Sequence, residues 1–234
     1  MPIEVFVASH LAQTTELEPR LAFTRTPAEG SAIVVAMTFF SDTALGAIPA
    51  DGVSDNQGNT YDLVAAGAPI TSQPTHAARG YLFLARGIGP VVEPFEVVAR
   101  PTIGGSPHFQ QMTWGALEVT GLAPTGVVDR TGSAPSTACC AFTNVATGGP
   151  TLQRNELAVG VLSMRSNDPD VQLAPETGWE QPHVWQDGQS VGNPHSLVWR
   201  IVAEPEVVTH TWTHDVPTRG ASAILATLRG VDPR

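Results

Sequence analysis

Apolar and polar residues alternate along most of this chain, and that period of two is typical of half-buried β-strands. The alternating segments are rich in β-branched and aromatic residues, and turn signals such as Asn56-Gln57-Gly58-Asn59 separate them. We find no sustained apolar repeat of helical period with caps. The pattern therefore predicts strands near 3–8, 19–26, 32–40, 60–65, 79–86, 93–100, 113–121, 156–164, 178–186, 195–204, 206–214 and 221–229.

The same alternation predicts which side chains share a face of a strand. We expect shared faces for Leu117 with Val119 (opposite Trp114 and Glu118), for Leu157 with Val159 and Val161, and for Leu197 with Trp199 and Ile201 (opposite Val198, Arg200 and Val202).

About a dozen short strands in 234 residues predict an all-β chain folded as a two-sheet antiparallel β-sandwich, jelly-roll-like in type. The sequence shows neither a low-complexity linker nor an internal repeat, so we expect one domain over 1–234. Within it, residues 1–10 are a candidate N-terminal docking segment. Residues 122–155, rich in Ala, Thr, Gly and Pro, are the weakest in pattern and suggest a long loop or an edge excursion.

Charge and composition exclude several function classes. The net charge of −10 repels a phosphate backbone, so nucleic acid is not an expected partner. All 12 basic residues are arginine, which excludes a Schiff-base lysine and a P-loop lysine. The adjacent Cys139 and Cys140 would point to opposite faces of a strand, so we expect two free thiols. We expect no cofactor, no signal peptide and no membrane insertion.

Several segments together resemble a known group of proteins. They include Val53-Ser-Asp-Asn-Gln-Gly-Asn-Thr-Tyr61, Tyr81-Leu-Phe-Leu-Ala-Arg86, Glu118-Val-Thr-Gly-Leu122, Glu156-Leu-Ala-Val-Gly-Val-Leu162, Gly178-Trp179 and the closing strand 221–228. Their order is similar to a loosely defined group of β-sandwich proteins of bacteriophages and bacteria, some of which resemble virion decoration, fibre or tail components. The resemblance spans roughly 11–229, and it implies no catalytic residues.

One candidate nucleophile stands out. Gly188-Gln189-Ser190-Val191-Gly192 matches the nucleophile elbow of hydrolases, and Glu204 or Glu206 followed by His210 completes the order of a catalytic triad. An elbow requires a helix after the serine, whereas Asn193-Pro194 and a strand follow Ser190 here. An esterase-like hydrolase is therefore the least favoured of the alternatives.

Aromatic and imidazole side chains gather late in the chain. His210, Trp212 and His214 share one face of a predicted strand, which is either a partly solvated outer face or a contact surface. On a strand, His210 and His214 lie about 13 Å apart, too far to share one metal ion. Trp179 and Trp185 could stack on sugars, although Trp179 after a glycine also suits a hydrophobic plug.

Oxygen-bearing side chains surround one turn. Asp55, Asn56, Asn59 and Asp62 offer the ligands that calcium prefers, although a tight turn needs the same residue types and the EF-hand spacing is absent.

These observations favour a non-enzymatic virion structural protein of a bacteriophage, a capsid decoration, fibre-base or tail component. It would lie in the virion, dock with other virion proteins and form a homo-oligomer in a symmetric assembly. The alternative from another class is a carbohydrate-binding adhesin module that binds cell-surface glycans.

Overall fold

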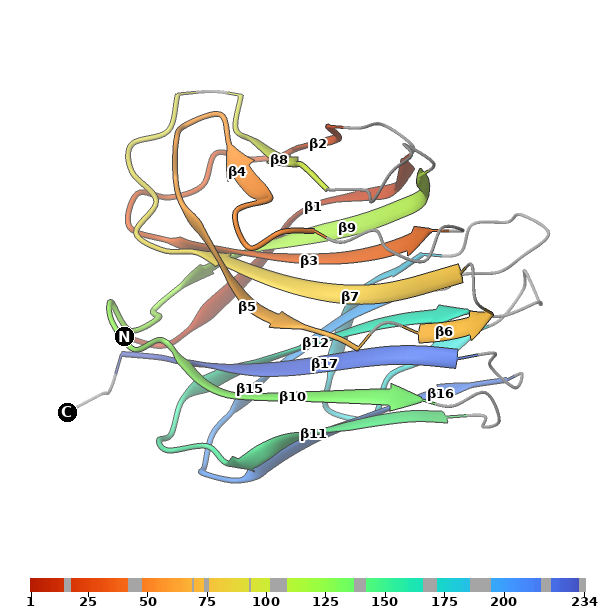
Figure 1. Ribbon diagram of the computed structural model, residues 1–234. Helices are drawn as coiled ribbons and strands as arrows, with labels where there is room; N and C mark the ends of the chain where they lie inside the picture. Colours follow the sequence, from red (N-terminus) through yellow and green to blue (C-terminus); the bar gives the residue numbers. More distant parts are fainter. Residues whose placement is uncertain are drawn as a thin grey trace.

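The computed structural model describes residues 1–14, 18–41, 48–68, 70–73, 76–92, 94–101, 109–136, 142–165, 172–185, 195–215 and 220–231. At some strand ends, among them 8–14 and 183–185, it describes the backbone alone. All regular elements of these residues are β-strands (Figure 1). In chain order they are β1 (Glu4–Thr14), β2 (Arg20–Ala22), β3 (Ala32–Ser41), β4 (Val53–Asp55), β5 (Tyr61–Ala66), β6 (Ile70–Gln73), β7 (His76–Ala85), β8 (Glu96–Ala99), β9 (Phe109–Thr120), β10 (Val128–Ser136), β11 (Phe142–Pro150), β12 (Glu156–Arg165), β13 (Leu173–Ala174), β14 (Glu180–Trp185), β15 (His195–Val202), β16 (Val207–His214) and β17 (Gly220–Arg229).

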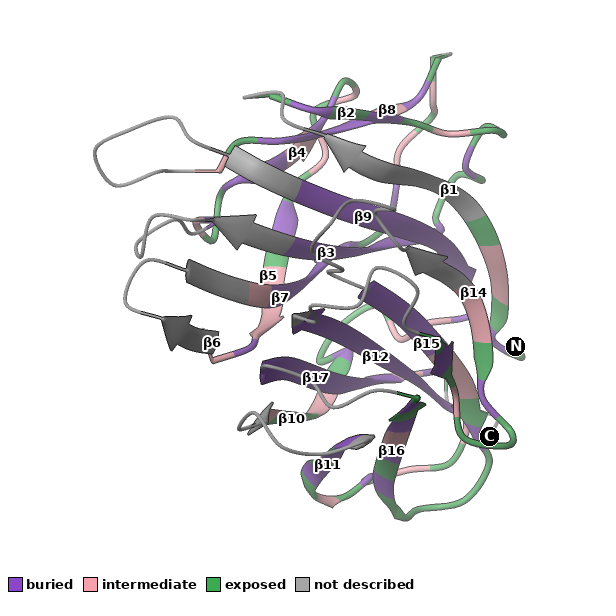
Figure 2. Cartoon of the chain, turned by 90° about the vertical axis from the view of Figure 1, so that its right-hand side faces the viewer, coloured by how far each residue is buried: buried purple, intermediate pink, exposed green. Residues whose placement is uncertain are grey.

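The strands form four antiparallel sheets. A six-stranded sheet has the order β1-β9-β3-β7-β5, with β6 also paired to β7, and a five-stranded sheet has the order β10-β17-β12-β15-β14. These two central sheets pack face to face. The N-terminal outer sheet, β2-β8-β4, covers the far side of the six-stranded sheet, and the C-terminal outer sheet, β11-β16-β13, covers the far side of the five-stranded sheet (Figures 1 and 2).

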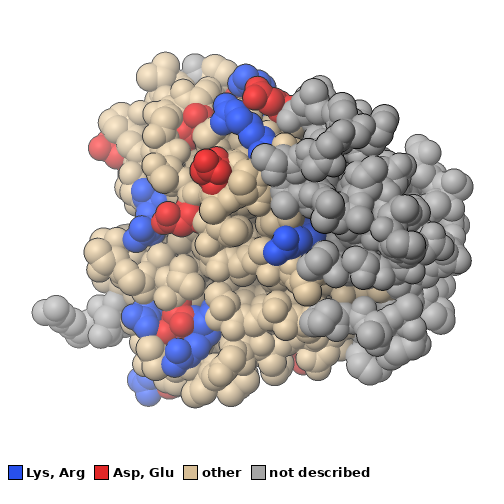
Figure 3. All heavy atoms as spheres, in the orientation of Figure 1, with Lys and Arg blue, Asp and Glu red and all other residues tan. Residues whose placement is uncertain are grey.

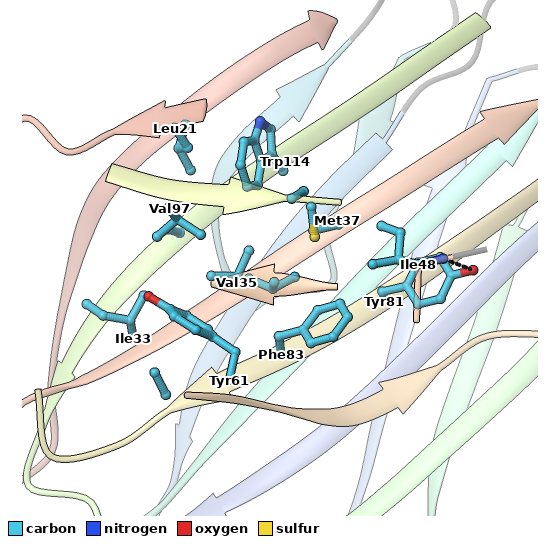
Figure 4. Packing of buried hydrophobic residues seen from close by; sticks show 14 of the residues in the cluster. Leu21, Ile33, Val35, Met37, Ile48, Tyr61, Tyr81, Phe83, Val97 and Trp114 are labelled. Atoms are coloured by element: carbon cyan, nitrogen blue, oxygen red, sulfur yellow. Dashed lines mark hydrogen bonds between the residues drawn. The ribbon is translucent and has the colours of Figure 1, made fainter. Parts of the chain in front are cut away.

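Three hydrophobic cores fill the spaces between the four layers. The strand period of two sends neighbouring side chains into different cores. In β3, for example, Val35 packs in the N-terminal core under the N-terminal outer sheet, whereas Val34 packs in the shared core between the two central sheets. Figure 4 shows part of the N-terminal core, with Val35, Met37, Phe83 and Trp114 pointing toward one another. The C-terminal core lies between the five-stranded sheet and the C-terminal outer sheet. Central strands are therefore buried on both faces.

The all-β antiparallel sandwich is confirmed, and the two outer sheets add a layer on each side of it. The jelly-roll detail of that expectation stays a prediction. The shared faces are also as expected: Leu117 with Val119, Leu157 with Val159, and Leu197 with Trp199 all contribute to the shared core. Ile201 is the exception, because at the end of β15 it is 38% exposed.

The weakly patterned segment 122–155 contains two strands instead of one long loop. β10 is an edge strand of the five-stranded sheet, and β11 is an edge strand of the C-terminal outer sheet. Both carry small and polar residues, which hid their alternation. The candidate docking segment 1–10 lies largely in β1, which pairs with β9 at one edge of the six-stranded sheet.

The two halves of the chain have the same strand order. Residues 4–120 form the six-stranded sheet and the N-terminal outer sheet, and residues 128–229 form the other two sheets. When β6 is set aside, β1, β2, β3, β4, β5, β7, β8 and β9 correspond in order to β10 through β17. With this correspondence, β1-β9-β3-β7-β5 becomes β10-β17-β12-β15-β14, and β2-β8-β4 becomes β11-β16-β13. Strand order alone does not test the expectation of one domain.

Candidate functional site

The strand face of His210, Trp212 and His214 was expected to be either a partly solvated outer face or a contact surface, and it is buried. His210 and Trp212 have no exposed surface, and His214 is only 4% exposed. The expected alternation of β16 is present, with buried and exposed residues following one another (Figure 2). The expectation that His210, Trp212 and His214 face outward was wrong, because β16 belongs to an outer sheet and these side chains lie on the inner face that covers the five-stranded sheet. These side chains therefore pack inside the protein and form no contact surface.

His210 lies in an aromatic cluster of the C-terminal core. Its ring centroid is 4.5 Å from that of Trp179 and 4.3 Å from that of Trp212, and the guanidinium of Arg200 lies 5.1 Å from the Trp179 ring centroid. Neither ring nitrogen of His210 has a hydrogen-bond partner. Burial, with the charge of Arg200 as a second cause, lowers the pKa of His210 to about 4. The imidazole is therefore neutral at pH 7 and serves as packing.

The tryptophans proposed as a sugar platform do not form one in the described residues. Trp179 is 8% exposed and packs against the C-terminal core, as the hydrophobic-plug reading predicts. The indole N–H of Trp212 donates to Ser196 Oγ at 3.0 Å inside the same core. The side chain of Trp185 lies outside the described residues, so its candidacy stays a prediction.

Asp55, the first of the calcium candidates, uses its carboxylate to hold its own turn. Asp55 Oδ1 accepts hydrogen bonds from the backbone N–H of Gln57 (2.9 Å) and of Asn59 (3.0 Å). Asp55 Oδ2 accepts from Asn59 Nδ2 (2.8 Å) and from the Tyr61 hydroxyl (3.1 Å). Burial and the adjacent Asp55 raise the pKa of Tyr61, which keeps its hydroxyl a donor. The motif that carries the family resemblance is thus a self-bonded turn.

The other calcium candidates also have partners. The amide of Asn56 donates from Nδ2 to the Pro94 carbonyl at 2.6 Å and accepts at Oδ1 from Glu96 N–H at 3.0 Å. Asp62 is exposed and pairs with Arg86 at 3.3 Å. No group of three or more His, Cys, Asp or Glu side chains able to hold a metal ion occurs in the described part of the chain. These contacts favour the interpretation that these side chains stabilise the turn over the interpretation that they bind calcium.

Replacing Asp55 by alanine is expected to lower the free energy of unfolding by about 2–3 kcal/mol, because four donors in and beside the turn lose their acceptor. Urea unfolding measures the loss. Asp62→Ala is the control and should cost less than about 1 kcal/mol, since it removes only an exposed ion pair. Calcium is expected to leave the unfolding midpoint unchanged, and a calcium-dependent rise would contradict the turn assignment.

A buried carboxyl pair was missed by sequence reasoning. Asp129 of β10 and Glu156 of β12 both have side chains without exposed surface, and the guanidinium of Arg229 pairs with Asp129. Leu152 N–H also donates to Asp129 Oδ2 at 2.7 Å. Burial alone would raise the pKa of Asp129, but hydrogen bonds from Arg229 and Leu152, with the charge of Arg229, lower it. Residues 129 and 229 are a hundred positions apart, so no local pattern could have indicated the pair.

Glu156 is the unusual member of this pair. Burial raises its pKa to about 7; the nearby Thr227 hydroxyl opposes the shift, and the negative charge of Asp129 adds to it. Neither Glu156 oxygen has a hydrogen-bond partner of good geometry. Neither carboxyl side chain has exposed surface, so the pair has the chemistry of an acid–base site but no surface that a substrate can reach.

Glu156→Gln is expected to stabilise the protein at pH 8 by up to about 3 kcal/mol and to have little effect at pH 4.5. The folded-state pKa of Glu156 lies above its ordinary value, so its favourable contribution is complete below about pH 4.5 and is lost as the pH rises through 7. Urea unfolding of both proteins across this range measures the difference. Glu206→Gln, at a partly exposed ion pair, is the control. A mutant-minus-parent difference that does not vary with pH would refute the assignment.

An open groove of about 790 Å³ lies at one end of the sandwich, and a smaller hollow of about 300 Å³ lies beside Phe23 and Phe95. The walls of the groove come from the turn at Gly58–Thr60, the ion pair of Asp62 with Arg86, and residues 122–125. Among the described residues on the face shown in Figure 3, acidic and basic side chains lie beside each other and form no patch of one sign. The described lining thus offers the polar side chains of Asn59, Thr60 and Thr125 and one ion pair, and it contains no histidine or cysteine.

The hydrolase alternative finds little support. Residues 186–194, including Ser190, lie outside the described residues, as do Cys139 and Cys140. The next described element is strand β15, not the helix that an elbow needs. The expected base, His210, is enclosed between sheets, and Glu204 and Glu206 pair with Arg154 and Arg200.

The chain matches no family model, and searches of curated proteins and of solved structures find no significant match. Within the described residues, no helix is long and apolar enough to cross a membrane.

Proposed function

We propose that the protein is a non-enzymatic structural component of a bacteriophage virion, a capsid decoration, fibre-base or tail protein that acts by docking. The placement of its perturbed ionisable groups supports this proposal most directly. In enzymes such groups gather in accessible clefts. Here the pKa values of His195, His210 and Glu156 are strongly shifted, and all three side chains are buried. The resemblance to virion β-sandwich proteins points in the same direction.

The edge strand β1 is the surface through which we propose that the protein docks with a neighbouring virion protein. β1 pairs with β9 on one side only among the described strands, and Val7 on it is 44% exposed. The unpaired backbone groups of an edge strand are a template for strand addition from another chain.

Particles purified from the organism that carries the gene provide the test. Quantitative mass spectrometry and immunogold labelling should find this chain in many copies per particle, as a symmetric assembly requires. Particles that contain none of it would contradict the proposal. For the docking surface, Val7→Lys should reduce incorporation at least tenfold, because a charged edge strand resists pairing. Val92→Lys, at an exposed loop valine, is the control and should incorporate normally.

A further inference from the structure

We infer that this chain is a fused dimer of two copies of one eight-stranded unit. The strands of the first copy span residues 4–120, with β6 as an additional strand, and those of the second span 128–229, and the two copies are joined through an interface of the kind that holds two identical subunits together. The identical strand order is the first observation. Eight strands distributed over two sheets in the same order twice within one chain is the signature of a structural repeat, and such repeats arise by duplication.

Each unit has its own core. The N-terminal core contains residues of the first half only, from Leu21 to Ala116, and the C-terminal core contains residues of the second half only, from Val145 to Leu225. The shared core draws equally on both, with Ile3, Ala32, Val34, Ala36, Leu82, Leu84, Leu117 and Val119 from the first half and Val127, Leu157, Val159, Val161, Leu197, Ile224, Ala226 and Leu228 from the second. Each half is thus a small sandwich, and the shared core is the interface between them.

The registers of the central strands correspond between the two halves. In the six-stranded sheet, Val34 pairs with Leu84 and Leu117, and Leu84 pairs in turn with Asp62. In the five-stranded sheet, Val159 pairs with Trp199 and Ala226, and Trp199 pairs in turn with Glu180. Equating Val34 with Val159 therefore equates the two acids, Asp62 with Glu180, and the buried aromatic before each, Tyr61 with Trp179.

Positions with special backbone requirements coincide under the same alignment. Gly30, directly before β3, has φ +80, and its equivalent Asn155, directly before β12, has φ +57; Asn155 is the one non-glycine residue of the described chain in this left-handed region. Gly121 and Gly230, which follow β9 and β17, are likewise equivalent. A Cβ at Gly121 would lie 2.3 Å from the Pro2 carbonyl oxygen, and one at Gly230 would lie 2.5 Å from the Asn155 carbonyl oxygen. Both sites thus exclude a side chain.

The contacts between the halves are self-complementary, as a two-fold interface requires. Leu122 forms an antiparallel bridge with Gly230, and Val231 N–H donates to the Gly121 carbonyl at 2.8 Å. Exchanging the halves converts the residue pair 122–230 into the pair 231–121, so one contact is the symmetry mate of the other. Similarly, β1 contacts β14 and β10 contacts β5, and these two edge contacts interchange.

The test separates the two units within the full chain. A protease site is inserted between Thr125 and Gly126, both exposed, and the chain is cut under native conditions. The cut protein should still elute as one particle of about 24.6 kDa and keep its far-ultraviolet circular dichroism. Val34→Glu, which faces the shared core, should then release two fragments that retain β-sheet dichroism and slow amide exchange. Val159→Glu, at the equivalent position, should do the same.

The matched control is Val35→Glu. Val35 is the next residue of β3, but it faces the N-terminal core, which contains residues of the first half only. It should abolish slow amide exchange throughout the first half. The inference is overturned if Val34→Glu and Val159→Glu unfold their halves as Val35→Glu does, because the halves would then not be separate units. It is also overturned if the cut alone unfolds the protein. A cut protein whose fragments stay joined when Val34→Glu and Val159→Glu are combined would overturn it as well.

Discussion

Lowering the pH from 7 to 3 is expected to unfold this protein, with a transition between about pH 3 and 5. Two enclosed histidines cause it. Burial lowers the pKa of His195 to about 3, and burial with the charge of Arg200 lowers that of His210 to about 4. Below the ordinary histidine pKa of 6.5, both imidazoles are protonated in the unfolded chain but stay neutral in the folded chain. The stability that is present above pH 6.5 is therefore lost as the pH falls.

The loss of stability from the two histidines is larger than the gain from protonating Glu156. Each histidine costs about 1.4 kcal/mol per pH unit below 6.5, which sums to roughly 8 kcal/mol by pH 3. Protonation of Glu156 contributes about 3 kcal/mol in the other direction, but that gain is complete near pH 4.5. A typical domain has only about 5–15 kcal/mol of stability. His195 shares a face of β15 with Leu197, which lies in the shared core, whereas His210 lies beside Trp212 in the C-terminal core. Acid is therefore expected to loosen both cores.

His210→Phe is the decisive variant for the acid transition. Phenylalanine fills the space between Trp179 and Trp212 without nitrogens that lack partners, so the acid midpoint should fall by about half a pH unit or more. Circular dichroism during acid titration measures the midpoint. Glu4→Gln, at an exposed carboxyl, is the control. An unchanged midpoint in His210→Phe would show that other groups govern acid unfolding.

Trp212→Ala is expected to lower the free energy of unfolding by about 3–5 kcal/mol, the second-largest effect we predict. The side chain is fully buried in the C-terminal core, where its indole N–H reaches Ser196 Oγ. Its ring also lies against Gly160 of β12, where a Cβ would come 3.2 Å from Trp212 Cη2. Removing the ring leaves a cavity between two rigid sheets that cannot close around it.

Urea unfolding of Trp212→Ala and Trp212→Phe measures this cost. The phenylalanine variant should lose less, because its ring retains part of the packing, although Ser196 loses a donor. Val207→Ala, at a half-exposed position of the same strand, should change stability by less than about 0.5 kcal/mol. A loss of less than 1 kcal/mol in Trp212→Ala would mean that the C-terminal outer sheet does not pack on the five-stranded sheet as described.

The candidate sites show where sequence reasoning ends. The polar turn at Asp55 and the buried position of Trp179 both follow from local chemistry: a carboxylate two residues before a backbone N–H that donates to it, and an aromatic after a glycine. The face of His210 and Trp212 was assigned to the outside because two sheets were expected. Because β16 belongs to an additional sheet that packs on the five-stranded sheet, the face of His210 and Trp212 is buried instead of exposed.

The sequence by itself determined the all-β class, most of the central strands and the faces on which Leu117, Leu157 and Leu197 lie. These features depend on the period of two, which the backbone imposes on any strand. Only the tertiary structure decided the four layers, the pairing of Asp129 with Arg229, the edge strands β10 and β11, and the duplicated order of the two halves. All of these features depend on contacts between residues far apart in the chain. Such contacts produce no periodic pattern in the sequence, because many different apolar side chains can fill the same space in a core.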